Sequence, residues 1–174
     1  MKNSRAISTD RSVTKPDKAA IVNPDKGALG WSFGYVFREA NRAFSDTFRA
    51  QLKSYGITLG QWFFLRELWD EEGLSQRELS RRVGVREPTT ATALEIMEKR
   101  GLILRRRKQR DHRSQFVHLT RKGRALRDRL LSLAIKVNER ALGDLSDHDA
   151  NDLRAKIMTM IANLAPAGDA DEGH

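Results

Sequence analysis

The sequence predicts a mainly α-helical fold with one small β-hairpin, and three observations indicate it. Apolar residues recur at steps of three and four through most of the chain between residues 29 and 164, which is the spacing of amphipathic helices. Two short helix signals follow each other directly between Ser75 and Gly101. Two runs of strand-favouring residues then flank a cluster of arginines. This order of parts is that of a winged helix-turn-helix with further helices on both sides.

A long helix is expected from Leu29 to Tyr55, and Gly56 supplies a permissive backbone for its end. Thr58 and Gln61 then have the spacing of a capping box, which predicts the start of a second helix. That helix is apolar on more than one side, so we expect it to be buried. The apolar stripe of the first helix consists of Phe33, Val36, Phe37, Ala40, Phe44, Phe48, Leu52 and Tyr55, and the second helix carries Trp62, Phe63, Phe64, Leu65, Leu68 and Trp69.

Two short helices should follow. Ser75 and Glu78 form a second capping-box pattern, and Gly84 suits the exit of a helix of about two turns. Pro88 then stands in the first turn of the next helix, where its missing N–H is not needed, and Gly101 suits the left-handed position after a helix end.

The N-terminal half of this second short helix carries Thr89, Thr90 and Thr92. Small side chains let a helix enter the major groove of DNA, where threonine can bond base edges or touch a thymine methyl group. The alternative is that these threonines only cap and fill the helix start.

Ile103-Leu104 and the run from Phe116 to Leu119 are expected to pair as a hairpin. The segment from Arg105 to Arg113 would form its tip, and it has six basic residues against the single acid Asp111. Such a run is often only a solvated surface. Directly behind a helix-turn-helix, it favours contact with phosphates instead.

Two more helices should complete the fold. Thr120 can cap a helix from Arg121 to about Asp144, and Ser146 can open a last helix. One winged domain has little surface on which to bury the long apolar stripes, so a second copy of the chain is the expected cover. The residues predicted for this homodimer interface are Leu29, Phe33, Leu145, Leu153, Ile157, Ile161 and Leu164.

Composition agrees with a nucleic-acid partner. The formal net charge is +9, and the segment from Arg86 to Arg127 alone holds thirteen Lys or Arg against four Asp or Glu. A concentrated basic segment neutralises phosphates and releases counterions. A membrane surface would also attract it, but no amphipathic basic helix with a broad apolar face accompanies the run. Double-stranded DNA is therefore the expected partner, with no membrane association.

Several classes of function are disfavoured. The sequence contains no cysteine, and its four histidines show no metal-binding pair spaced by four. No glycine-rich phosphate loop or nucleophile motif is present, and the pair Glu71-Glu72 is interpreted as the solvated end of a helix. We expect no enzyme, no cofactor and no metal site. Without a signal peptide or a spanning segment, the expected location is the cytoplasm.

The arrangement resembles the MarR family of bacterial transcriptional regulators over about residues 29–164. The motifs that carry the resemblance are Glu98-Lys99-Arg100-Gly101-Leu102-Ile103, then Asp111-His112-Arg113, and Leu119-Thr120-Arg121-Lys122-Gly123. The resemblance implies a triangular dimer whose recognition helices enter successive major grooves of a pseudo-palindrome. It also implies that Arg113 enters the minor groove and that Asp111 orients it.

The chain departs from the common family pattern at the recognition helix. Many relatives carry an acidic residue where Arg86 stands, a serine at Pro88 and an arginine at Thr92, so base contacts cannot be copied over. The predicted DNA-binding residues are Ser75, Gln76, Arg86, Thr89, Thr90, Thr92, Arg105, Arg106, Arg107, Lys108, Arg110, Asp111 and Arg113.

Family members commonly respond to a small aromatic or phenolic acid, so the resemblance also implies an effector site between the dimer helices and the winged domain. The residues expected there are Phe37, Arg38, Asn41, Phe44, Trp62, Phe63 and Arg66. The alternative is that these aromatic residues are ordinary core.

The resulting organisation is a flexible basic arm over residues 1–28, a helical dimerisation region over 29–57 and 120–165, a winged helix-turn-helix DNA-binding domain over 58–119, and a disordered tail over 166–174. The expected function is a homodimeric, ligand-responsive repressor that binds a specific DNA sequence. A nonspecific nucleoid-associated or RNA-binding protein is the alternative, because charge alone does not distinguish the two.

Overall fold

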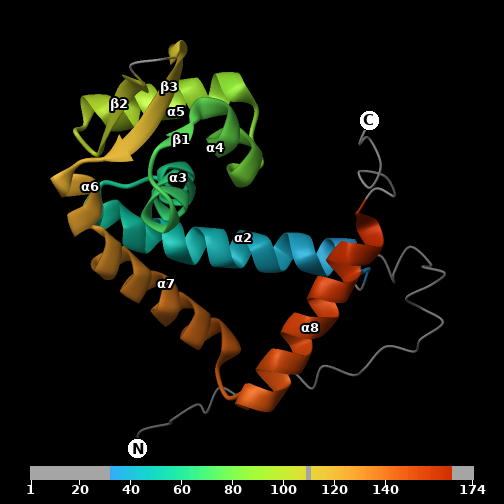
Figure 1. Cartoon of the computed structure of the whole chain (residues 1–174). Coiled ribbons are helices and arrows are strands. Elements are labelled where there is room, and N and C mark those ends of the chain that lie inside the picture. Colours follow the sequence, from blue (N-terminus) through green and yellow to red (C-terminus); the bar gives the residue numbers. More distant parts are fainter. Residues whose placement is uncertain (1–31, 109–110, 166–174) are drawn as a thin grey trace, which may run out of the picture. The chain divides into compact units, whose positions relative to one another are not determined.

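The computed structural model describes residues 32–108 and 111–165 (Figure 1). The predicted arm over residues 1–28 and tail over 166–174 lie outside the described residues, as does Leu29. The chain divides into two compact units, Met1–Ser45 and Asp46–His174. In chain order the elements are α2 (Phe33–Leu52), the 3-10 helix η2 (Lys53–Tyr55), α3 (Leu59–Asp70), β1 (Leu74–Ser75), α4 (Gln76–Val83), α5 (Glu87–Lys99), β2 (Ile103–Lys108), β3 (Asp111–Leu119), α6 (Arg121–Ala125), α7 (Arg127–Leu142) and α8 (Asp147–Leu164).

The helix starts follow the predicted capping patterns. Thr58 accepts from the Gln61 N–H, and the Gln61 side chain accepts from the Thr58 N–H at 3.1 Å. Ser75 and Glu78 make the same reciprocal pair at the start of α4. Each box satisfies two backbone donors that a helix N-terminus leaves without intrahelical partners. The predicted starts of α3 and α4 are therefore confirmed.

The helix ends follow the glycines. Gly56 has φ +63° after η2, and Gly84 has φ +74° after α4. Gly101, with φ +66°, comes directly after the C-cap of α5. Only glycine adopts these left-handed backbone angles without steric cost.

The strands form an antiparallel sheet in the order β1-β3-β2. Ile103 pairs with Leu119 and Arg105 with Val117, while the two-residue strand β1 places Leu74 opposite Val117. Strand β1 was not predicted. The prediction that the basic run forms the hairpin tip is wrong for most of its length, because β2 continues to Lys108 and β3 begins at Asp111.

The helix predicted from Arg121 to Asp144 is present in two pieces. Thr120 caps α6 by accepting from the Gly123 N–H, and the helical hydrogen bonding is interrupted at Leu126 before α7. Ser146 caps α8 by accepting from the Asp149 N–H, as predicted.

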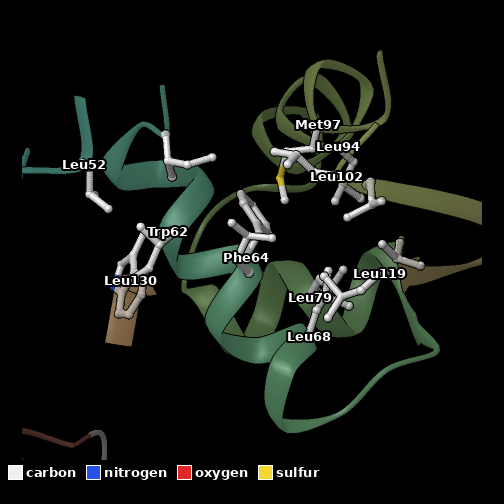
Figure 2. Packing of buried hydrophobic residues seen from close by; sticks show 14 of the residues in the cluster. Leu52, Trp62, Phe64, Leu68, Leu79, Leu94, Met97, Leu102, Leu119 and Leu130 are labelled. Carbon is white, nitrogen blue, oxygen red and sulfur yellow. The ribbon is translucent and has the colours of Figure 1, made fainter. Parts of the chain in front are cut away.

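The core of the second unit lies among α3, α4, α5 and the sheet (Figure 2). Figure 2 shows Phe64, Leu68 and Leu79 directed toward Leu94, Met97 and Leu102. The buried apolar residues are Phe48, Leu52, Ile57, Trp62, Phe64, Leu65, Leu68, Leu74, Leu79, Leu94, Met97, Leu102, Ile103, Val117, Leu119, Leu130 and Val137. This is the mainly α fold with a β-hairpin wing that the sequence predicts.

A search of the described helices for a membrane span found none that is both long enough and apolar enough.

Candidate nucleic-acid interface

The two helices of the helix-turn-helix are joined by a buried hydrogen bond. The Ser80 hydroxyl of α4 donates to the Thr90 hydroxyl of α5 at 2.7 Å, and the exposed fraction of Thr90 is 0%. The Val85 N–H also donates to the Ser80 carbonyl in the connecting turn. Because Thr90 points into the protein, the prediction that it contacts DNA is wrong. Its hydroxyl fixes how α5 starts against α4.

The outward face of α5 carries the other two predicted threonines. Thr89 and Thr92 are exposed, as is Arg86 at the N-cap. The Thr92 hydroxyl donates to the Pro88 carbonyl at 3.1 Å. Ile96, one turn further along, is 46% exposed. The helix therefore presents small and apolar groups outward while Leu94 and Met97 face the core.

Two other predicted contacts lie at the start of α4. Ser75, its N-cap residue, is engaged in the capping box and also donates its hydroxyl to the Glu78 carboxylate at 2.6 Å. This bond is the main reason why the pKa of Glu78 lies below its ordinary value. Gln76, the first residue of α4, is partly exposed.

Arg105 was predicted to contact phosphates, but in the structure it binds a carboxylate of the same chain. Its guanidinium donates twice to one oxygen of the Glu98 carboxylate, at 2.8 and 2.6 Å, and its backbone N–H donates to the other oxygen. The side-chain hydrogen bond from Arg105 lowers the pKa of Glu98. Arg105 thus ties β2 to α5, and its charge is already balanced. Arg106, the next residue, is exposed.

The sequence of the wing continues with further basic residues beyond Arg106. Arg107 lies opposite Gln115 in the ladder, and Lys108 lies opposite Asp111 after a register shift. The predicted contact Arg110 lies outside the described residues, and for Arg107, Lys108, Asp111 and Arg113 only the backbone is described. Figure 1 shows the hairpin beside α4 and α5 in the second unit.

The base of the wing is held by Thr120. Its hydroxyl accepts from the Gly123 N–H at 3.1 Å, as a helix cap, and donates to the Gly101 carbonyl at 2.6 Å. A Cβ atom on Gly123 would lie 2.2 Å from the Leu102 carbonyl oxygen, so only glycine fits there. Lys122 donates to the Arg100 carbonyl at 3.0 Å. The motif from Leu119 to Gly123 therefore attaches α6 to the end of α5.

Glu72 also binds the base of the wing, through hydrogen bonds to β3 and α6. Its carboxylate accepts from the Leu119 N–H at 3.2 Å and from two nitrogens of Arg124 at 2.7 Å. The Arg124 hydrogen bond is the largest reason why the pKa of Glu72 is lowered. Glu71 and Glu72 are both exposed, in agreement with their interpretation as a solvated helix end, but Glu72 also joins the end of β3 to α6. Sequence spacing gave no signal, because its partners lie 47 and 52 residues away.

The predicted dimer residues of the last helix are on its surface. No residue of α8 is buried, and Leu153 and Ile161 are 45% and 56% exposed. Leu164 and Leu145 are exposed too, and Ile157 is partly exposed. In the first unit, Phe33 is exposed and contacts Phe37, with ring centroids 6.3 Å apart.

The predicted effector residues of α3 differ in environment. Trp62 is buried, and its ring packs edge-on against Phe48 at 4.9 Å and against Trp69 at 5.6 Å. It is part of the core, as the alternative interpretation held. Phe63 is exposed, and the Arg66 guanidinium lies 6.0 Å from its ring.

The predicted effector residues of α2 belong to the first unit. Phe37, Asn41 and Phe44 are exposed there. Arg38 lies 5.0 Å from the Tyr35 ring and pairs with Glu39.

A pocket of about 350 Å³ lies between α3 and α7. Arg66 and Trp69 line it from α3, and Arg127 and Leu131 line it from α7. The Trp69 indole N–H donates to the Gly123 carbonyl at 3.0 Å, which fixes the ring in place. The carboxylates of Glu67 and Asp70 line it too, and the Arg66 guanidinium is paired with Glu67 at 2.9 Å. The pocket therefore combines two apolar side chains with two guanidinium groups and two carboxylates.

Comparisons with known proteins cover most of the chain. A family model described as the MarR family matches residues 57–115. The HTH-type transcriptional regulator MgrA of Staphylococcus aureus is 30% identical over 136 residues, which are 78% of this chain and 89% of that protein. These relatives are regulators of transcription rather than enzymes.

Solved structures agree in fold and length. The transcriptional repressor CouR bound to a 23-mer DNA duplex matches with a TM-score of 0.70 and 28% identity, over 80% of this chain and 99% of that chain. A MarR transcriptional regulator from Methanosarcina mazei Go1 matches with a TM-score of 0.69 and 28% identity, over 75% and 94%. The region matched by the family model contains α3, β1, α4, α5, β2 and the start of β3.

Proposed function

Because this chain belongs to the MarR family of DNA-binding transcriptional regulators, we propose that it is a homodimeric repressor of a pseudo-palindromic operator, released by a small organic acid. The observation that carries the proposal is the outward face of α5 next to the basic wing. Thr89, Thr92 and Arg86 are exposed on a helix whose start is fixed by the buried Ser80–Thr90 bond. A fixed, slim helix is what entry into a major groove requires.

In the proposed complex, α5 contacts bases and the wing contacts the backbone and the minor groove. Arg113 enters the minor groove, because a guanidinium fits its narrow, electronegative floor. Arg86, Arg106, Arg107, Lys108 and Arg110 contact phosphates. Half-sites in such a two-fold dimer lie about one helical turn, ~10 base pairs, apart. A dimer bound to the operator blocks RNA polymerase, so repression is the simplest regulatory output. The protein would act in the cytoplasm.

Selection from a random duplex library with the full chain tests sequence specificity. We expect enrichment of a two-fold symmetric site that binds ~10³-fold or more tightly than random DNA at physiological salt. Equal affinity for both would favour the nucleoid-associated alternative, and preference for RNA would favour an RNA-binding protein.

Variants assign the two DNA-contacting elements. Arg113→Ala should weaken operator binding about tenfold or more, whereas Arg129→Ala removes the same charge from α7 outside the proposed surface and should leave affinity nearly unchanged. Thr89→Ala should weaken the selected site more than random DNA. A uniform loss on both DNAs would assign Thr89 to the backbone.

The homodimer is supported by the exposed apolar stripe of α8, which resembles an interface lacking its partner. Leu153→Asp should place a charge within that interface and shift sedimentation toward monomer while circular dichroism keeps its helical signal. Met158→Asp introduces the same charge beside the proposed interface as a control. A Leu153→Asp protein that remains fully dimeric would remove α8 from the interface.

The effector proposal is supported by the pocket between α3 and α7. A ligand carboxylate that takes the place of Glu67 on Arg66 would accept from Arg66 and Arg127, while Trp69 and Leu131 cover an aromatic ring. Titration of the protein–operator complex with aromatic and phenolic acids should release the DNA, and Arg66→Gln should raise the concentration needed. Since a ligand shifts an equilibrium only by its preference for one state, absence of release by any acid would contradict this part of the proposal.

A further inference from the structure

The exposed face of α5 carries methyl groups in a row. Thr89, Thr92 and Ile96 stand at positions i, i+3 and i+7, and all three are exposed. With about 3.6 residues per turn, this spacing keeps them on one side of the helix. Ile96 leaves 46% of its surface in water although the core lies on the opposite side of the same helix. Ile96 is neither in the core nor among the apolar residues that pack against it.

The same face has little capacity for hydrogen bonds to bases. From Glu87 to Glu98, α5 contains no Arg, Lys, Asn or Gln, the side chains that most often bond guanine or adenine. The Thr92 hydroxyl already donates its hydrogen to the Pro88 carbonyl. The Lys99 ammonium is paired with the Glu95 carboxylate at 2.6 Å. The Glu95 carboxylate, which could otherwise accept from cytosine, is the partner of that ammonium. Apart from the Thr89 hydroxyl, apolar contact is therefore the readout that remains for this face of the helix.

We propose that α5 recognises its operator mainly through thymine C5-methyl groups in the major groove, with Ile96 as a specificity-determining residue and with the methyl groups of Thr89 and Thr92 beside it. This inference rests on the proposed function. Thymine is the one standard base with a methyl group in the major groove, and covering that group removes apolar surface from water. The exposed charges of Arg86 and Arg106 attract any duplex. Methyl contacts supply the discrimination that these charges lack.

Replacing thymine by deoxyuridine tests the proposal, because this change removes only the methyl group. The probe is the duplex selected from a random library, with one thymine replaced at a time and affinity measured by fluorescence anisotropy on the full chain. Each thymine that α5 covers should lose affinity about fourfold on replacement, the effect of exposing one methyl-sized group. Replacements outside the half-sites should leave affinity unchanged.

A double-mutant cycle identifies the residue that reads each methyl group. In Ile96→Ala, the thymine-to-uracil affinity ratio should fall to about one at one position of each half-site and keep its value elsewhere. Ile135→Ala truncates an exposed isoleucine on α7 and should leave every ratio unchanged. A merely structural role of Ile96 would lower all affinities together without changing any ratio.

Two results would overturn the inference, and they differ from failure of the proposed function. One is a selected site that tolerates uracil at every position but loses affinity with 7-deazapurines, which lack the N7 acceptor. The other is a selected site without thymine in the half-sites. Equal affinity for selected and random DNA would instead contradict the proposed function itself.

Discussion

The winged block, residues 57–125, and the last helix α8 have similar local sequence signals but differ in the burial of their apolar side chains. Both contain helices that start at a capping side chain and carry an apolar stripe. In the winged block, Leu65, Leu79 and Leu94 are completely buried. In α8, no residue is buried. The two regions differ in whether the second unit itself buries the apolar stripe.

Hydrogen bonds show the same contrast. In the winged block, side chains join distant residues, for example Trp69 to Gly123 and Arg124 to Glu72. The side-chain bonds described for α8 join residues only three or four positions apart, such as Lys156 to Asp152. Local signals therefore determine that α8 is a helix, whereas long-range bonds position the helices of the winged block.

Truncation of one large apolar side chain in each region should give the largest difference. Leu65→Ala removes a fully buried side chain and should lower the free energy of unfolding by ~2–5 kcal/mol. Met158→Ala, at a 58% exposed position of α8, should change it by no more than ~0.5 kcal/mol. Urea unfolding measures both. Similar losses would mean that the two regions do not differ in burial.

Adding one methyl group should distinguish a close backbone approach from an open one. Gly123→Ala should cost ~1–3 kcal/mol, because the new Cβ would meet the Leu102 carbonyl oxygen and force α6 away from it. Gly60→Ala, in the first turn of α3, meets only ordinary contacts and should be neutral or stabilise by up to ~1 kcal/mol. Thermal unfolding of both variants decides this, and a neutral Gly123→Ala would show that the contact relaxes freely.

Removal of the N-caps of α6 and α8 should give a smaller difference in stability. Thr120→Ala loses the cap of α6 and the bond to the Gly101 carbonyl, for a cost of ~2 kcal/mol. Ser146→Ala loses a cap within α8 alone and should cost ~1 kcal/mol. Hydrogen exchange should show the Thr120 effect across the winged block and the Ser146 effect confined to α8. An effect of Thr120→Ala confined to α6 would contradict the comparison.

The smallest expected effect is the dependence of stability on pH through Glu72. Because the pKa of Glu72 is lowered in the folded state, its stabilisation is present above the unfolded-state pKa of about 4.3 and is lost as pH falls through the folded pKa. Glu72→Gln should therefore cost ~1 kcal/mol at pH 7, and the difference from the unchanged protein should shrink as the pH falls below the unfolded-state pKa and vanish once the pH is below the folded-state pKa. Glu139→Gln, the same change on α7, serves as the control. A cost independent of pH would assign the effect to packing.

Local chemistry explains how much of the fold was predictable. The caps at Thr58, Ser75, Thr120 and Ser146 depend on residues three positions apart, so the sequence alone indicates them. Strand β1 depends on pairing with β3, which lies more than 40 residues later in the chain. The interruption at Leu126 likewise has no signal in the spacing of apolar residues, which continues across it.

The candidate site was predictable in position but not in detail. Neighbouring helix residues point about 100° apart, so Thr89 faces outward while Thr90 faces the core. The sequence names both threonines but does not fix the rotation of α5. Arg105 counts as free charge in the sequence, and only the fold shows that Glu98 binds it.

Ser75 has two structural roles. It is the last residue of β1, which pairs with β3 of the wing, and it is also the N-cap of α4. The wing and α4 are therefore connected through a single residue. The hydrogen bond from Ser80 to Thr90 in turn connects α4 to α5. Neither element can tilt without carrying the other. In the proposed dimer, a signal that releases DNA would therefore turn each winged block as a unit, and the distance between the two winged blocks would be the quantity that regulation changes.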